Sequence, residues 1–122
     1  MLVDDTPEIA DLLRMALTDH GFDVAATGFD TRIDEQLLRE RPMAVVLDCS
    51  VYAMSETLFD AIRAHPELAT LPVVIISDTP EQAVTSLQAR EAEHVLLVPK
   101  PFSGSQVARA LEQLLPRDAS AS

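Results

Sequence analysis

The sequence predicts an α/β fold in which five parallel strands alternate with five helices in a doubly wound sheet. Two observations lead to this prediction. Short unbroken apolar runs occur at 45–47, 73–76 and 95–98, as is typical of strands that are covered on both faces. Between the runs lie segments whose apolar residues repeat with helical spacing. A sheet of this class uses right-handed crossovers and binds ligands at the carboxyl ends of its strands.

The first strand and the first helix are expected at the start of the chain. The strand should end at about Val3. Thr6, Pro7 and Glu8 suit the cap, the first position and the first turn of the helix that follows, and Gly21 is expected to end it. The predicted buried face of this helix consists of Ile9, Leu12, Leu13 and Leu17.

The remaining elements follow in order along the chain. We expect a second strand near 22–26, a helix over 33–38, and a third strand that ends at Asp48. A helix around 58–62 leads to a fourth strand that ends at Ser77, and a further helix leads to a fifth strand that ends near Pro99. The last helix covers 107–115, with Ser103 or Ser105 as its cap.

Length and composition predict one domain. The chain has 122 residues, of which 48% are hydrophobic, enough for one sizeable core. We expect the domain to span 1–116, with 117–122 as a flexible tail or the start of a linker. Only Met1 to Val3 precede the first acidic pair, so we expect natural residues before Met1.

Charge and cysteine content narrow the classes of function. The formal net charge of −11 would repel a nucleic-acid backbone or an anionic membrane surface. Cys49 is the single cysteine and cannot form an intramolecular disulfide, and the sequence has neither a signal peptide nor a long apolar span. We therefore expect a cytoplasmic protein that contacts neither nucleic acid directly nor a membrane.

Charged and hydroxyl side chains stand at the carboxyl ends of four of the five predicted strands. They are Asp4 and Asp5, Asp48, Ser77 and Lys100. Three carboxylates at one rim repel one another, so a hard divalent cation such as Mg²⁺ is the simplest explanation for them. A carboxylate beside Mg²⁺ can attack a phosphoryl donor, and Ser77 and Lys100 would supply a hydroxyl and a positive charge to the transferred group.

This pattern resembles the receiver domain of two-component response regulators. The residues that carry the resemblance are Leu2-Val3-Asp4-Asp5, Val45-Val46-Leu47-Asp48, Ile75-Ile76-Ser77 and Lys100-Pro101-Phe102. It implies a flavodoxin-like (βα)5 fold with strand order 2-1-3-4-5, and Asp48 as the acceptor of a phosphoryl group from a histidine kinase or phosphotransfer protein. It also implies that Asp4, Asp5, Asp48 and the Ser50 carbonyl surround Mg²⁺, that Ser77 and Lys100 contact the phosphoryl group, and that the Lys100–Pro101 peptide is cis.

Three features depart from the family pattern. The segment Cys49 to Glu56 lacks the usual Met-Pro step and later Gly, and Leu97 stands where the family usually has an aromatic residue that swings inward on phosphorylation. Asp78 replaces a small residue, and we expect this extra anion to slow phosphorylation by small donors. Tyr52 is interpreted as an exposed loop residue, with a lid over the site as the alternative.

Two other functions are consistent with parts of the pattern. One is a receiver-like interaction module that works without phosphorylation, with Leu97 and the altered loop as a fixed surface. The other is a Mg²⁺-dependent phosphatase, but such enzymes typically need an acid two residues after the nucleophile, where this chain has Ser50. We expect no enzyme activity beyond the protein's own phosphorylation and dephosphorylation.

The output is expected to come from a partner. The chain after Leu115 is too short for an effector domain, so a downstream effector protein or domain is implied. By the family resemblance, the docking or homodimer face is formed by the fourth helix, the fifth strand and the fifth helix. Its residues include Gln82, Leu87, Arg90, Glu91, Val107 and Arg109.

Overall fold

The computed structural model describes residues 1–28, 30, 32–49, 52–100 and 102–115. Its five parallel strands form one sheet in the order β2-β1-β3-β4-β5, as predicted. The strands are β1 (Leu2–Asp4), β2 (Ala26–Thr27), β3 (Val45–Asp48), β4 (Val73–Ser77) and β5 (Val95–Pro99).

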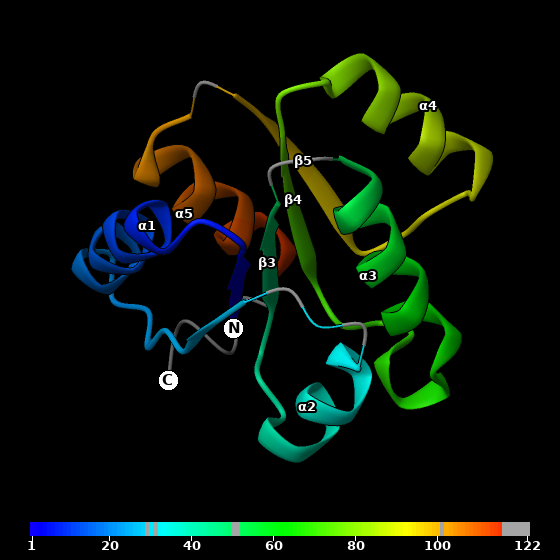
Figure 1. Ribbon diagram of the computed structural model, residues 1–122, viewed down its shortest axis with the longest axis horizontal. Helices are drawn as coiled ribbons and strands as arrows, with labels where there is room; N and C mark the ends of the chain where they lie inside the picture. The colour runs from blue at the N-terminus through cyan, green and yellow to red at the C-terminus, as the bar shows by residue number, and fades with distance from the viewer. Residues whose placement is uncertain (29, 31, 50–51, 101, 116–122) are drawn as a thin grey trace.

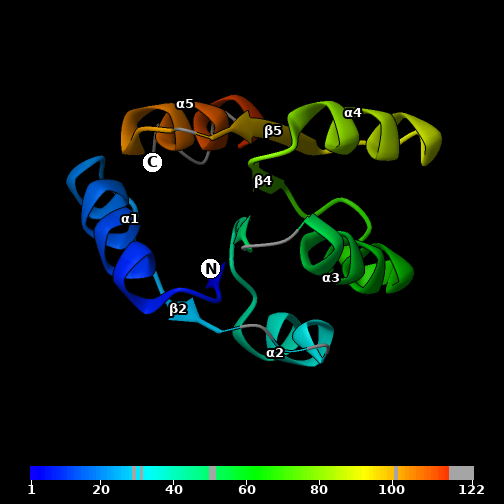
Figure 2. The same ribbon diagram turned by 45° about the horizontal axis from the view of Figure 1, so that its top comes forward.

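Helices cover both faces of the sheet, so the molecule has three layers (Figure 1). The helices are α1 (Pro7–Asp19), α2 (Ile33–Glu40), α3 (Tyr52–Ala64), the short 3₁₀ helix η1 (Pro66–Leu68), α4 (Pro80–Ala89) and α5 (Gly104–Leu114). Figure 2 shows α1 and α5 on one side of the sheet and α2, α3 and α4 on the other. Within the described part of the chain, no helix is long and apolar enough to cross a membrane.

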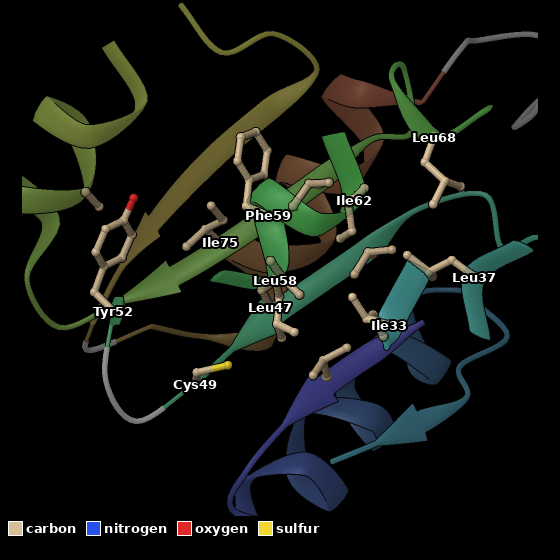
Figure 3. Close-up of a cluster of buried hydrophobic side chains, with 14 residues drawn as sticks. Ile33, Leu37, Leu47, Cys49, Tyr52, Leu58, Phe59, Ile62, Leu68 and Ile75 are labelled. Atoms are coloured by element: carbon tan, nitrogen blue, oxygen red, sulfur yellow. The ribbon is translucent and has the colours of Figure 1, made fainter. Parts of the chain in front are cut away.

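Successive residues of the central strands alternate between two apolar cores. Val45, Leu47, Val73 and Ile75 pack with α2 and α3, whereas Val46, Val74 and Ile76 pack with α1 and α5. Figure 3 shows the first of these clusters, in which Leu58, Phe59 and Ile62 of α3 contribute side chains. Both faces of these strands are therefore buried, which explains their unbroken apolar runs.

The predicted helix ends are largely confirmed. Gly21 follows α1 with a φ of 92°, a left-handed conformation that a Gly adopts without strain. Ser103 caps α5 in a capping box, in which its hydroxyl accepts from the Gln106 N–H and the Gln106 side chain accepts from the Ser103 N–H. Thr6 occupies the N-cap position of α1 without a side-chain cap bond.

α1 and α5 approach each other closely at Gly104. A Cβ atom placed on Gly104 would collide with Ala16 of α1. The absence of a side chain at this position lets the two helices pack on the same face of the sheet.

Two sequence-based predictions, the bounds of the second strand and the buried face of the first helix, are wrong in detail. β2 is Ala26–Thr27 rather than 22–26, and these two residues pair with Leu2 and Val3 of the short strand β1 at the edge of the sheet. On α1, Leu13 and Leu17 are buried with Ala10, but Ile9 and Leu12 are 36% and 69% exposed. The spacing of the apolar residues fits two overlapping helix faces, and only the one that includes Ala10 meets the core.

Tyr52 also differs from its expected exposed position in a loop. It is the first residue of α3, and its side chain is only 6% exposed. The ring belongs to the cluster of Figure 3, as does Ala83 of α4, and Leu97 of β5 packs against this cluster. Tyr52 therefore fills space between α3, α4 and β5 and is a core residue.

Candidate functional site

Four of the predicted site residues converge at the carboxyl ends of the strands. Asp4 and Asp48 end β1 and β3 and lie directly opposite each other in the parallel ladder. Ser77 ends β4, and the Lys100 N–H that follows β5 donates to the Ser77 carbonyl at 2.8 Å. The alternation of strands and helices therefore brings residues from four segments of the chain to one rim.

Asp48 is the most deeply placed acid of this rim. Its side chain is 1% exposed, and the Lys100 Nζ lies 3.1 Å from its Oδ1. Its other oxygen, Oδ2, is buried and has no hydrogen-bond partner among the described residues. A buried carboxylate oxygen without a partner is unfavourable, so this atom is suited to receive a ligand.

Asp4 has the same arrangement of one satisfied and one unsatisfied oxygen. Its Oδ1 accepts from the Thr6 N–H at 2.8 Å, and its Oδ2 is buried without a partner in the described part of the chain. Burial raises the pKa of Asp4 from 3.8 to about 6, the nearby Asp48 carboxylate adds to the rise, and the Thr6 N–H opposes it. Lys100 contacts Asp48, whereas Asp4 accepts from the neutral Thr6 N–H.

The two unsatisfied oxygens fit a hard divalent cation. Among the described residues, no group of three or more His, Cys, Asp or Glu side chains forms a ready-made metal site. Mg²⁺ requires less than this, because it commonly binds through one or two carboxylates and keeps several waters. Asp4 and Asp48 meet that requirement, and half-buried Asp5 follows Asp4 directly.

Two predicted features lie outside the described residues. They are the Ser50 carbonyl, predicted as a metal ligand, and Pro101 of the predicted cis peptide. The metal set and the loop after β5 are therefore described only through Asp4, Asp5, Asp48 and Lys100.

The Ser77 hydroxyl has a partner that sequence reasoning missed. The Thr79 N–H donates to Ser77 Oγ at 3.0 Å, and the two hydroxyl oxygens are 3.2 Å apart. Ser77 is 2% exposed, so Thr79 makes the polar contacts of an otherwise enclosed hydroxyl. A Ser-x-Thr sequence before a helix was the available signal, but it is also common in turns that have no function.

The residues that depart from the family pattern surround this rim in different ways. Leu97 is half-buried and packs against the cluster that holds Tyr52. Cys49 is 3% exposed, and burial raises the pKa of its thiol, which keeps it protonated. Asp78 is exposed, so its charge acts on the site through solvent.

Comparison with known proteins identifies the family of this arrangement. A family model for the response regulator receiver domain matches residues 1–112. The chain belongs to this family. Receiver domains are typically not true enzymes.

Two curated relatives are transcriptional regulatory proteins. The chain is 32% identical over 120 residues to the probable transcriptional regulatory protein TcrX of Mycobacterium tuberculosis, covering 96% of this chain and 49% of that protein. It is 29% identical over 122 residues to the transcriptional regulatory protein GltR of Pseudomonas aeruginosa, covering 96% and 48%. The chain thus spans about half the length of the curated relatives it matches.

Solved structures share the fold. The receiver domain of NtrX from Brucella abortus aligns with a TM-score of 0.67 at 31% identity, covering 91% of this chain and 96% of that one. The receiver domain of a sensor histidine kinase from Pseudomonas aeruginosa aligns with a TM-score of 0.75 at 20% identity, covering 93% of each chain. That structure has a magnesium ion coordinated in its active-site cleft.

Proposed function

We propose that this receiver domain accepts a phosphoryl group on Asp48 from a histidine kinase or phosphotransfer protein, in a reaction that depends on Mg²⁺. The observation that carries the proposal is the state of the Asp48 carboxylate. It is almost fully buried, one oxygen contacts the Lys100 ammonium at 3.1 Å, and the other has no partner among the described residues. An acid held in this way gains contacts when a ligand arrives.

Asp4, Asp5 and Asp48 would hold the cation, with the Ser50 carbonyl as a further ligand. The unsatisfied oxygens of Asp4 and Asp48 support this set. Magnesium in the active-site cleft of the Pseudomonas relative supports the choice of ion. Bound there, Mg²⁺ would neutralise negative charge on the phosphoryl oxygens.

The transfer itself requires few protein groups. An Asp48 oxygen attacks the phosphorus atom, a P–O bond forms, and the P–N bond to the donor histidine breaks. The electron pair of that bond stays on the histidine nitrogen. Lys100 offers an ammonium to the developing charge, and Ser77 offers a hydroxyl once it turns from Thr79.

Signal output would use a partner. We place the domain at 1–116, with 117–122 as a tail or linker toward an effector protein or domain. By the family resemblance, the docking or homodimer face consists of α4, β5 and α5. The charge of −11 argues against direct contact of this domain with nucleic acid.

A labelling experiment tests the proposal. The protein is incubated with phosphoramidate, with Mg²⁺ or with EDTA, and its intact mass is measured. We expect one phosphoryl group per chain in Mg²⁺ and none in EDTA, and Lys100→Ala should label poorly while remaining folded. Equal labelling with and without Mg²⁺ would show that the acidic rim does not act through a cation.

A phosphorylation-independent interaction module is the second candidate. Leu97 favours it, because an aliphatic side chain at this position packs in the core without the rotameric switch of an aromatic ring. Beryllofluoride with Mg²⁺, which mimics a phosphoryl group, separates the two candidates. No spectral change around Asp48 and Lys100 at saturation would favour the fixed module.

A further inference from the structure

Thr79 links the proposed phosphoryl site to the start of α4. Its N–H donates to Ser77 Oγ at 3.0 Å, and its hydroxyl oxygen lies 3.2 Å from the same atom. Thr79 is also the N-cap residue of α4. One side chain therefore stands between a residue of the site and a helix on the predicted output face.

The Thr79 hydroxyl has two competing uses. A Thr at the N-cap normally accepts a hydrogen bond from an N–H group of the first helical turn. No side-chain cap bond is made by Thr79 in this structure. An N-cap side chain reaches the N–H groups of the second and third helical residues, which are Glu81 and Gln82 in α4. The hydroxyl is turned to Ser77 instead.

A phosphoryl group on Asp48 changes the demand on Ser77. The oxygens of that group accept hydrogen bonds, so Ser77 must direct its single O–H proton toward them. A Ser77 side chain that turns to the site loses its present contact with Thr79 Oγ1. The Thr79 hydroxyl is then available to cap α4.

The other end of α4 is fixed. Arg90 follows α4 and donates to both carboxylate oxygens of Asp60 on α3, at 2.8 Å and 3.0 Å. Ser86 of α4 also donates to Glu56 of α3, at 2.7 Å. These contacts with α3 lie away from the first turn of α4, which is next to Thr79.

From these contacts we infer that Thr79 is a positioning residue. Its hydroxyl holds the Ser77 hydroxyl in the unphosphorylated protein, and it forms the side-chain cap bond of α4 when Ser77 binds the phosphoryl group. This inference rests on the proposed function. It provides a route from Asp48 to α4 that needs no aromatic residue at Leu97.

The test uses beryllofluoride with Mg²⁺ and follows the Gln82 amide by NMR and hydrogen exchange. In the wild type, binding should shift the Gln82 resonance and slow its exchange. Thr79→Val keeps the shape and removes the hydroxyl, so the Gln82 response should vanish. Beryllofluoride should still bind this variant, because Ser77 and Lys100 are unchanged and the variant lacks both the Ser77 contact of the free state and the cap bond that replaces it. Thr79→Ser should restore the response.

Thr85→Val is the matched control. Thr85 lies in α4, and its hydroxyl donates to the Glu81 carbonyl at 3.0 Å, away from Ser77. This variant should keep the wild-type response of Gln82. A Gln82 response in Thr79→Val equal to that of the wild type would overturn the inference alone. A wild type that binds no beryllofluoride would overturn the proposed function and this coupling together.

Discussion

Leu47 and Asp48 are neighbours in β3 and are buried to the same degree, at 0% and 2% exposure, yet their burial has opposite energetic consequences. Leu47 packs in an apolar cluster, where removal from water stabilises the fold. Asp48 and its neighbour Asp4 each hide a carboxylate oxygen without a partner in the described part of the chain, which opposes folding. The interior of the sheet thus stabilises the domain, whereas the buried carboxylate oxygens of its rim destabilise it.

The largest expected effect comes from the interior. Leu47→Ala should lower the free energy of unfolding by about 2–5 kcal/mol, because it removes buried apolar surface and leaves a cavity. Leu12→Ala is the matched control, since Leu12 is 69% exposed, and it should change stability by no more than about 0.5 kcal/mol. Urea unfolding measures both. Equal losses in the two variants would contradict the assignment of the core.

A rim substitution should have the opposite sign. In EDTA, Asp4→Asn should raise the free energy of unfolding by about 1–2 kcal/mol at neutral pH, because it removes a buried charge and keeps an oxygen for the Thr6 N–H. The same variant should lose most of the stabilisation that Mg²⁺ gives the wild type. Urea unfolding with and without Mg²⁺ checks this. A variant that is less stable than the wild type in EDTA would show that Asp4 supports the fold directly.

The pH dependence of stability follows from the same group. The pKa of Asp4 is about 6 in the folded state and 3.8 is its ordinary value, so between these pH values the folded state binds more protons than the unfolded state. This contribution to stability is complete below about pH 4 and is lost as the pH rises through about 6. In EDTA, the stability difference between Asp4→Asn and the wild type should therefore grow over this range. A difference that is constant with pH would contradict the pKa assigned to Asp4.

The smallest expected effect belongs to an exposed charge beside the rim. Asp78→Ala should speed labelling by phosphoramidate, by no more than about fivefold, because a solvent-exposed charge contributes roughly 1 kcal/mol or less. Glu67→Ala removes another exposed charge, from η1, and should leave the rate unchanged. Time courses of intact mass give both rates. An unchanged rate in Asp78→Ala would remove Asp78 as a cause of slow phosphorylation.

The same contrast explains which parts of the molecule could be predicted from the sequence. Buried strands such as Val73–Ser77 carry a continuous apolar run, so their positions and the residues that end them were predictable. β2 lies at the edge of the sheet and has only two residues, Ala26 and Thr27, neither of which is buried. It therefore carries little periodic signal.

Contacts between side chains were less predictable than the positions of the strands and of the residues that end them. Strand order brings Asp4, Asp48, Ser77 and Lys100 to one rim, but the sequence could not show that Thr79 contacts the Ser77 hydroxyl. Nor could it show that Tyr52 turns into the core, because that depends on the space left between α3, α4 and β5. Such details are set by packing among segments that are distant in sequence.

Chemical mapping of the phosphoryl group tests the central claim most directly. After incubation with phosphoramidate and Mg²⁺, borohydride reduces an aspartyl phosphate to homoserine, which peptide mass spectrometry can locate. We predict homoserine at position 48 alone, and none in Asp48→Asn. Homoserine at Asp4 or Asp5, or a wild-type protein that acquires none, would contradict the account.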